Sequence, residues 1–416
     1  MQTLPRTISR LRRATVSDGR TVDVLIDGGL VTAVLEGGSL PATFADDELD
    51  LTGFLLLTAP AEPHAHLDKA LSWDEIRPPL GDLGLAIESW RKYAETMTVE
   101  SITQRARTQA LHMLALGTTA IRTHVDILLG AQPLRSAQAL VTVREELRDL
   151  IDIEIVALAG PEAPDADVEA ALDLGVDLIG GAPHLAADPS ADLQRLLAIA
   201  ARRGVGVDIH TDEALGGGST LAELARSVRG WSLPASAGHC VRLGTMDADA
   251  RALTIAEVKA SDVGIIANPI TNLYLQGWQH PTSTPRGLTA VRELIDAGVR
   301  VAAGADNVRD PFNPLGRSDA LETSMLLVAA GHLTVDEAYA AVSDTARSVM
   351  SLPPAGVFRG GRAELLAIRG SSLADVVANA PADRYVLHAG RLVAASRITV
   401  EVAVPNSSLI PVLETR

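Results

Sequence analysis

The chain is poor in the residues that mark secreted, membrane-spanning or nucleic-acid-binding proteins. It has one cysteine among 416 residues, so no disulfide can form within the chain and a reducing compartment is expected. The net charge is −16, and the only basic cluster is Arg10-Leu11-Arg12-Arg13, which argues against nucleic acid or an anionic membrane as a partner. No apolar run approaches the roughly 18 residues of a spanning helix. We therefore expect a cytoplasmic protein.

Aromatic residues are also scarce. They make up 3% of the chain against 47% for apolar residues as a whole, so the core must be built from Ala, Leu, Val and Ile. A chain of this length can bury an extensive core. No Gly-x-Gly-x-x-Gly follows a predicted strand, which excludes the usual dinucleotide fingerprint.

What the sequence does contain is a regular alternation between about residues 57 and 350. Short apolar runs typical of buried strands alternate with helical patterns, of which residues 137–147 and 193–203 are examples. The eight strand candidates are Phe54–Thr58, Thr118–His124, Ile153–Ala159, Val176–Gly180, Val205–Ile209, Ala235–His239, Val263–Asn268 and Val301–Ala303. Eight strand-helix units predict an α/β fold, namely a (β/α)8 TIM barrel over residues 57–360.

The two ends of the chain have a different character. Residues 22–26 and 31–35 flank an Asp27-Gly28-Gly29 turn, which predicts a hairpin. Residues 364–368 and 385–388 have a similar β-like composition. Both ends are predicted to be small all-β segments.

Histidines gather at one end of the predicted strands. Six of the ten lie at or just past a strand's C-terminal end: His64, His66, His124, His184, His210 and His239. The eighth strand ends at Gly304-Ala305-Asp306-Asn307. Active sites of TIM barrels are assembled at this face from several strands. Two polar residues after an edge strand would explain a lone His-x-His, but not six histidines at one face, so the pattern favours a metal site.

The residue types suggest individual roles. Three imidazoles and one carboxylate, from His64, His66, His210 and Asp306, suit one divalent ion such as zinc or ferrous iron, which would lower the pKa of its water from about 16 towards about 7. Asp306 could accept the water's proton, Glu213 could carry a proton to a substrate nitrogen, and His239 could polarise the water or stabilise an oxyanion. The alternative for Glu213 is a solvated loop carboxylate. His124 and His184 could instead be core histidines.

Several segments together resemble the amidohydrolase superfamily, in particular its cytosine-deaminase-like branch with one metal ion. The matching segments are Pro63-His64-Ala65-His66-Leu67-Asp68, Arg122-Thr123-His124-Val125-Asp126, Ile209-His210-Thr211-Asp212-Glu213, Ala237-Gly238-His239, Ala267–Gly277, Gly304-Ala305-Asp306-Asn307 and Asp310–Gly316. The resemblance implies the ligand set His64, His66, His210 and Asp306. It also implies that Glu213, His239 and Asp306 are catalytic, and that residues 1–56 and 361–416 pair into a small β-sandwich domain. In such a reaction hydroxide adds to an amidine-like ring carbon and ammonia leaves.

The sequence departs from cytosine deaminases where they read their substrate. Those enzymes carry, after the third strand, a Gln that contacts the amide edge of the pyrimidine, whereas this chain has Ala159-Gly160-Pro161-Glu162. Asn307 stands where they have a second Asp, and Phe312 where they have Trp, which makes these two the candidate substrate-binding residues. The segments 307–310 and 66–69 resemble instead the N-isopropylammelide hydrolases, which lack a counterpart of Glu213.

We therefore expect a metal-dependent deaminase of a small nitrogen heterocycle, cytosine-like or larger. The alternative is a hydrolase of a cyclic amide or of an N-alkylamino ring. A third and remote hypothesis is a non-catalytic barrel. An acidic, Ala/Leu-rich barrel is also compatible with homo-oligomers. The outer wall of the pocket, around residues 72–90 and 273–285, is predicted to consist of loops.

Overall fold

The chain forms two compact units in the computed structural model, which describes residues 4–43 and 45–401. One unit combines both ends of the chain, residues 1–58 and 355–416, and the other is the continuous segment Ala59–Pro354. The two units are described separately below.

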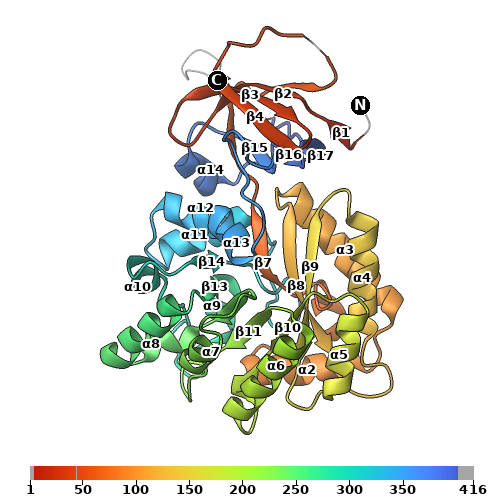
Figure 1. Ribbon diagram of the computed structural model, residues 1–416, viewed down its shortest axis with the longest axis vertical. Helices are drawn as coiled ribbons and strands as arrows, with labels where there is room; N and C mark the ends of the chain where they lie inside the picture. The colour runs from red at the N-terminus through yellow and green to blue at the C-terminus, as the bar shows by residue number, and fades with distance from the viewer. Residues whose placement is uncertain (1–3, 44, 402–416) are drawn as a thin grey trace. The chain divides into compact units, whose positions relative to one another are not determined.

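The larger unit is a parallel eight-stranded barrel with helices around it (Figure 1). Its strands are β7 (Ala61–Ala65), β8 (Ala120–Ile127), β9 (Asp152–Ala159), β10 (Leu178–Gly181), β11 (Val207–Thr211), β12 (Ala235–His239), β13 (Gly264–Ala267) and β14 (Val301–Ala303). Each strand pairs with the next in chain order. A parallel bridge between Ala65 and Asp306 brings the last strand back to the first.

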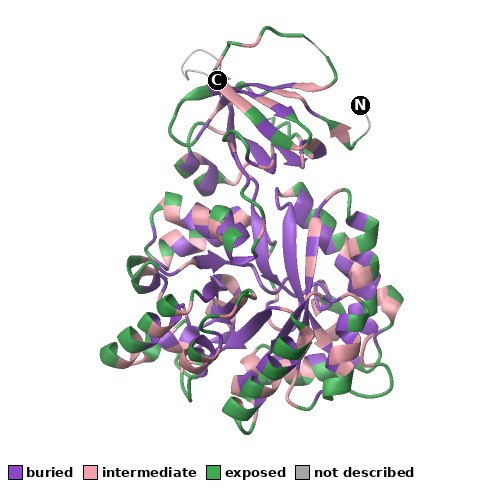
Figure 2. Ribbon diagram, viewed as in Figure 1, coloured by how far each residue is buried: buried purple, intermediate pink, exposed green. Residues whose placement is uncertain are grey.

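Helices connect these strands, and three more helices follow the last strand. They are α1 (Trp73–Ile76), α2 (Leu83–Ala94), α3 (Val99–Ala115), α4 (Arg135–Leu147), α5 (Asp165–Asp173), α6 (Pro189–Arg203), α7 (Leu221–Ser227), α8 (Ala248–Ala260), α9 (Pro269–Leu275), α10 (Val291–Asp296), α11 (Ala320–Ala329), α12 (Val335–Val342) and α13 (Asp344–Val349), with two 3₁₀ turns at Pro183–Leu185 and Val241–Thr245. Figure 2 shows that the barrel strands are mostly buried while the helices alternate between buried and exposed faces.

Helix α6 illustrates why these segments become helices. Asp188 caps its first turn by accepting the N–H of Ala191, and Gly204 ends it in the left-handed conformation that glycine adopts readily. Its buried residues recur at helical spacing: Leu193, Leu196, Leu197 and Ala200. The stripe packs towards the barrel and leaves the charged face in solvent.

The smaller unit is a nine-stranded sheet that combines strands from both chain ends. Its strands are β1 (Arg6–Thr7), β2 (Arg10–Thr15), β3 (Thr21–Asp27), β4 (Leu30–Glu36), β5 (Glu48–Asp50), β6 (Phe54–Thr58), β15 (Leu365–Arg369), β16 (Arg384–His388) and β17 (Arg391–Ser396), and helix α14 (Leu373–Asn379) lies between β15 and β16. One apolar cluster contains residues from both ends, among them Leu11, Val24, Leu365 and Leu387. The predicted hairpin is present as β3 and β4. The predicted fold class, a TIM barrel with a small β unit from the two ends, is confirmed.

The prediction for the first barrel strand was wrong. Phe54–Thr58 is β6 of the smaller unit, where Leu57 pairs with Leu366 of β15. The first barrel strand is β7, whose sequence includes Glu62, Pro63 and His64 and so has no apolar run to reveal it. The histidines also lie slightly earlier than predicted, because His64, His124 and His210 fall within their strands.

The prediction of loops along the outer wall was also wrong in part. Helix α2 occupies residues 83–94, begins at Asp82, which accepts the N–H groups of Gly84 and Leu85, and buries Ala86, Trp90 and Ala94. Glycine and proline before it suggested a loop, but the four-residue spacing of these buried side chains is that of a helix. Among the residues that the structure describes, no helix combines the length and apolarity needed to cross a membrane.

A buried arginine links its own barrel strand to three others. Arg122 on β8 is 1% exposed, and its guanidinium donates to Glu154 of β9 at 2.5 Å, to Asp208 of β11 at 2.8 Å and to Ser236 of β12 at 2.9 Å. Asp208 is completely buried. Removing the cation would leave that carboxylate in a dry interior without its charge partner.

We expect Arg122→Met to lower the free energy of unfolding by about 3–5 kcal/mol, because one member of a buried ion network is lost. The control is Arg107→Met, whose partly exposed pair with Glu146 should contribute at most about 1 kcal/mol. Urea unfolding followed by circular dichroism measures both. Equal effects of the two substitutions would contradict the prediction.

Candidate active site

The ends of the barrel strands turn sharply where the predicted site residues lie. Asp212, His239 and Asp306 have φ values of 52°, 67° and 59°, in the left-handed region that residues other than glycine seldom adopt. Such conformations persist only where the surrounding structure enforces them, and they are frequent at functional sites. Here they direct residues from three different strands towards the same end of the barrel.

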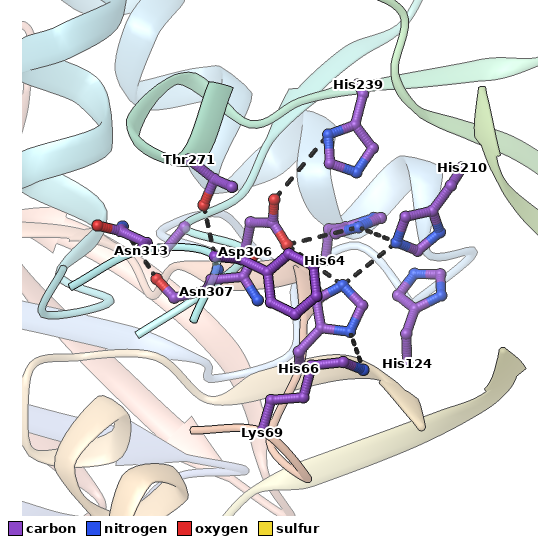
Figure 3. Close-up of polar contacts among 12 residues, drawn as sticks. His64, His66, Lys69, His124, His210, His239, Thr271, Asp306, Asn307 and Asn313 are labelled. Atoms are coloured by element: carbon purple, nitrogen blue, oxygen red, sulfur yellow. Dashed lines mark hydrogen bonds and ion pairs between the residues drawn. The ribbon is translucent and has the colours of Figure 1, made fainter. Parts of the chain in front are cut away.

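Four side chains from three regions of the sequence converge on one point (Figure 3). Nε2 of His210 lies 3.2 Å from Nε2 of His64 and 3.2 Å from Nε2 of His66. Oδ1 of Asp306 lies 3.2 Å from Nε2 of His66 and 3.9 Å from Nε2 of His64. All four side chains are buried.

The three separations of 3.2 Å would suit a metal-ligand set, whereas that between His64 and Asp306 is longer at 3.9 Å. Metal–nitrogen bonds of about 2.0–2.1 Å in a tetrahedral site separate neighbouring ligand atoms by about 3.4 Å. Burial lowers the pKa of His64, His66 and His210 well below the usual value, so each imidazole is neutral and offers a lone pair. Burial raises the pKa of Asp306 to about 6, an unfavourable setting for a carboxylate that a cation would relieve.

A second group of side chains lies beside this cluster. Nδ1 of His239 is 3.9 Å from Oδ2 of Asp306 and 3.8 Å from Oε1 of Glu213. His184 approaches the other oxygen of Glu213, with Nε2 at 3.8 Å from Oε2. The side-chain nitrogen of Asn272 lies 3.1 Å from Nδ1 of His239. The structure therefore brings Glu213, His239 and Asp306 together, as the sequence analysis expected.

Glu213 is held in a state suited to proton transfer. It is 5% exposed, so the solvated-loop alternative does not apply. Burial raises its pKa to about 7, opposed by the neighbouring His184. A carboxyl group with a pKa near neutrality can both accept and donate a proton under ordinary conditions.

Backbone and small residues make room for the converging rings. A Cβ on Gly238 would lie 2.6 Å from Cε1 of His64, so only glycine leaves space for that imidazole. A Cβ on Gly304 would lie 2.4 Å from Oε1 of Glu62. The Glu62 carboxylate accepts the N–H groups of His64 and Ala305, which fixes β7 against the segment after β14.

The site opens into a cavity of about 580 Å³. His66, His210, Glu213, His239 and Asp306 line it. The lining also includes the apolar side chains of Leu83, Ile87, Trp90, Leu128, Leu129, Leu158 and Leu185. Asn307 and Phe312, the two candidate substrate-binding residues, also line it. The Asn307 amide donates to Asp310 at 2.8 Å, which fixes its orientation.

Other histidine and acidic residues of the motifs have supporting positions. His124 is completely buried, stacks on His64 with ring centroids 4.2 Å apart, and lies 3.7 Å from Asp208. Asp212 accepts the N–H of Thr220 and the hydroxyl of Ser219, so it fixes the loop before α7. Cys240 is buried and its pKa is raised by burial, which keeps it a thiol.

Sequence reasoning gave no role to Glu62, Asp208, Thr271 or Asn272, although all are buried around the site. Glu62 and Asp208 each lie two residues before a histidine of the cluster, so the i, i+2 alternation of a strand places them on the same side. An acidic residue two positions before a histidine was therefore the pattern in the sequence that could have identified Glu62 and Asp208 as neighbours of the site. Thr271 and Asn272 belong to α9, inside the segment Ala267–Gly277 that carries part of the family resemblance, and that match was the signal for them.

The sequence profile described as "Amidohydrolase family" matches residues 159–394, more than half of the chain. The chain belongs to the amidohydrolase family. It is therefore a hydrolase acting on C–N bonds other than peptide bonds, in a family that depends on metal ions.

The proteins to which this amidohydrolase is similar include two deaminases and an isopropylaminohydrolase. The pterin deaminase of Rhizobium rhizogenes is 31% identical over 89% of this chain and 87% of its own length. The solved 5-methylcytosine deaminase of Klebsiella pneumoniae, liganded with 5-fluorocytosine, is 25% identical with a TM-score of 0.85, over 95% of this chain and 99% of that one. N-isopropylammelide isopropylaminohydrolase of Burkholderia multivorans is 28% identical with a TM-score of 0.78, over 93% and 99%.

We expect Gly238→Ala to weaken binding of a divalent ion by this amidohydrolase at least about tenfold, because the added methyl group displaces the His64 ring. Zinc titration against a competing chelator measures the affinity. Gly216→Ala is the control, since a Cβ there meets no atom within 4 Å. Unchanged zinc affinity in Gly238→Ala would show that His64 is not needed at the convergence point.

Proposed function

We propose that this amidohydrolase is a metal-dependent hydrolytic deaminase of an aminated nitrogen heterocycle, with a two-ring substrate of the pterin type as the first choice and a cytosine-like ring as the second. The observation that carries the proposal is the placement of Glu213 and His239 in one cavity with His66, His210 and Asp306. Hydrolytic removal of an amino group needs an activated water and a proton donor for the ring, and these residues can supply both.

His64, His66, His210 and Asp306 would hold one divalent ion, zinc or ferrous iron. Nε2 of His210 lies 3.2 Å from Nε2 of His64 and of His66, Oδ1 of Asp306 lies 3.2 Å from Nε2 of His66, and the set mixes nitrogen and oxygen ligands. When bound, the ion supplies Lewis-acid activation of water at neutral pH. Oδ1 of Asp306 faces His66, and its Oδ2 faces His239. The Oδ2 atom is thus the one available to accept the proton of the attacking water.

The remaining steps fall to Glu213 and His239. Protonated Glu213 donates to the ring nitrogen beside the carbon under attack, and its pKa of about 7 lets it recover a proton afterwards. His239 donates to the oxygen that gains negative charge as the tetrahedral adduct forms. The new C–O bond is kept and the bond to the exocyclic nitrogen breaks. Of the two protons of water, one ends on the ring nitrogen and the other on the departing nitrogen, which leaves as ammonia.

The size and composition of the cavity support the larger ring. A volume of about 580 Å³ lies well inside the range for drug-sized ligands, and apolar side chains of α2 extend the wall beyond the catalytic residues. The 31% identity to a pterin deaminase over most of both chains supports the same choice.

A second candidate is hydrolysis of an N-alkylamino triazine. The 28% identity to N-isopropylammelide isopropylaminohydrolase and the resemblance of the segments 66–69 and 307–310 favour it. The same cavity and water activation would serve, but an alkylamine would leave in place of ammonia. The leaving group therefore separates the two candidates.

We expect the zinc- or iron-loaded enzyme to release ammonia from at least one aminated ring in a panel of pterins, pyrimidines, purines and triazines, with pterin turned over fastest. Glu213→Gln should reduce kcat at least about 10²-fold, because a positioned acid–base residue is lost. Coupled ammonia detection and mass spectrometry of the product provide the readout. Alkylamine from a triazine with no ammonia from any ring would replace this function with the second candidate.

We also expect removal of the metal to abolish activity and to be reversible. Dialysis against a chelator should give an inactive enzyme that one equivalent of zinc or ferrous iron restores, as measured by metal analysis beside the ammonia assay. His66→Ala should bind less metal than the wild type and remain inactive after reloading. Full activity in the metal-free enzyme would contradict the proposed ligand set.

A further inference from the structure

An ion pair in the cavity wall is left unused by the mechanism above. Lys69 and Asp126 both line the cavity, and Nζ of Lys69 lies 2.6 Å from Oδ1 of Asp126. Lys69 is 3% exposed, whereas the Asp126 side chain is 19% exposed. Nζ of Lys69 also lies 3.6 Å from Oδ1 of the completely buried Asp68, so the ammonium faces two carboxylates, of which only that of Asp126 lines the cavity. Charged groups are costly to keep in a largely apolar wall.

The pair lies one imidazole ring away from the metal-ligand cluster. Nε2 of His66 faces Asp306 at 3.2 Å, and Nδ1 of the same ring lies 3.4 Å from Nζ of Lys69. Figure 3 shows Lys69 and Asp306 on opposite sides of His66. A six-membered substrate ring is about as wide as an imidazole. A ring whose reacting carbon is held at the cluster can therefore present another edge to Lys69.

The pair offers one donor and one acceptor side by side. A ring carbonyl with an adjacent ring N–H presents the complementary acceptor and donor. The side-chain amide of the Gln in cytosine deaminases also combines one donor and one acceptor and can pair with such an edge. This chain has no such side chain there, because the small residues Ala159 and Gly160 line the cavity instead.

We infer that Lys69 and Asp126 form the substrate-reading pair of this enzyme, with the Lys69 ammonium donating to a ring carbonyl oxygen and the Asp126 carboxylate accepting the adjacent ring N–H. The substrate class is thereby restricted to aminated rings that carry this carbonyl and N–H edge. The inference rests on the proposed function and specifies its substrate.

The surrounding contacts hold Asp126 ready for that role. Trp90 on α2 donates from Nε1 to Oδ2 of Asp126 at 2.6 Å, and the Asp126 backbone N–H donates to Oδ2 of Asp68 at 3.0 Å. Lys69 lies 5.3 Å from the centroid of the Trp90 ring. These contacts fix the pair while the partly exposed edge of the carboxylate remains open to the cavity. Hydrogen bonds to charged groups are about twice as strong as neutral ones, so a ring without the carbonyl should be strongly disfavoured.

The test compares two substrates that differ only at this edge: pterin, and 2-aminopteridine, which lacks the ring carbonyl and with it the adjacent ring N–H. Lys69→Met keeps the aliphatic stem and removes the charge. We expect it to lower kcat/KM for pterin about 10²-fold while changing that for 2-aminopteridine less than threefold. Lys92→Met is the matched control, since Lys92 is exposed on α2. Metal content and thermal midpoint are measured for each variant.

Equilibrium binding provides a readout independent of turnover. The deaminated product, pteridine-2,4-dione, keeps the carbonyl and N–H edge, and we expect Lys69→Met to weaken its binding by a similar factor. If Lys69→Met does not fold, Lys69→Gln retains an N–H donor and should lose discrimination only in part. An equal fall in kcat/KM for both substrates, or unchanged affinity for the product, would show that the pair is structural only and overturn the inference. Absence of ammonia from every ring would instead remove the proposed function, and the product-binding comparison would still test the pair.

Discussion

The closure of the barrel determines everything else about the candidate site. The Asp306 backbone N–H donates to the His64 carbonyl at 3.0 Å, and the Glu62 carboxylate accepts N–H groups from both sides of the same junction. These bonds join the first strand to the segment after the last one. Without them, a carboxylate and a pair of histidines from opposite ends of the barrel sequence would have no reason to lie 3.2 Å (His66) and 3.9 Å (His64) apart. The ligand geometry is thus a property of the closed barrel.

Burial then sets the chemistry of these groups in opposite directions. The same dry interior lowers the pKa of His64, His66 and His210, and raises the pKa of Asp306 and Glu213. Neutral imidazoles are good ligands for a cation, and a carboxyl group near neutrality is a good proton carrier. One physical cause, desolvation, therefore prepares two kinds of function within a few ångströms.

The sequence predicted the barrel and the convergence of the histidines because both depend on the spacing of apolar residues and on the order of the segments along the chain. Seven of the eight predicted barrel strands correspond to β8 to β14, since their apolar runs are required by burial on both faces. The first strand was not predicted because β7 contains Glu62, Pro63 and His64 and so has no apolar run. Helix α2 was not predicted because it lies in an irregular connection between β7 and β8. Contacts such as Glu62 with Ala305 join residues far apart in sequence, and no local pattern reveals them.

Helix α2 has a consequence for how such an enzyme could diversify. It contributes Leu83, Ile87 and Trp90 to the cavity, yet it carries none of the residues that converge on Asp306. Mutations along its inner face can widen, narrow or reshape the chamber while the strands that hold the reactive groups stay as they are. Descendants of this chain could therefore exchange one ring for another through changes in a single helix, with the hydrolytic machinery inherited intact.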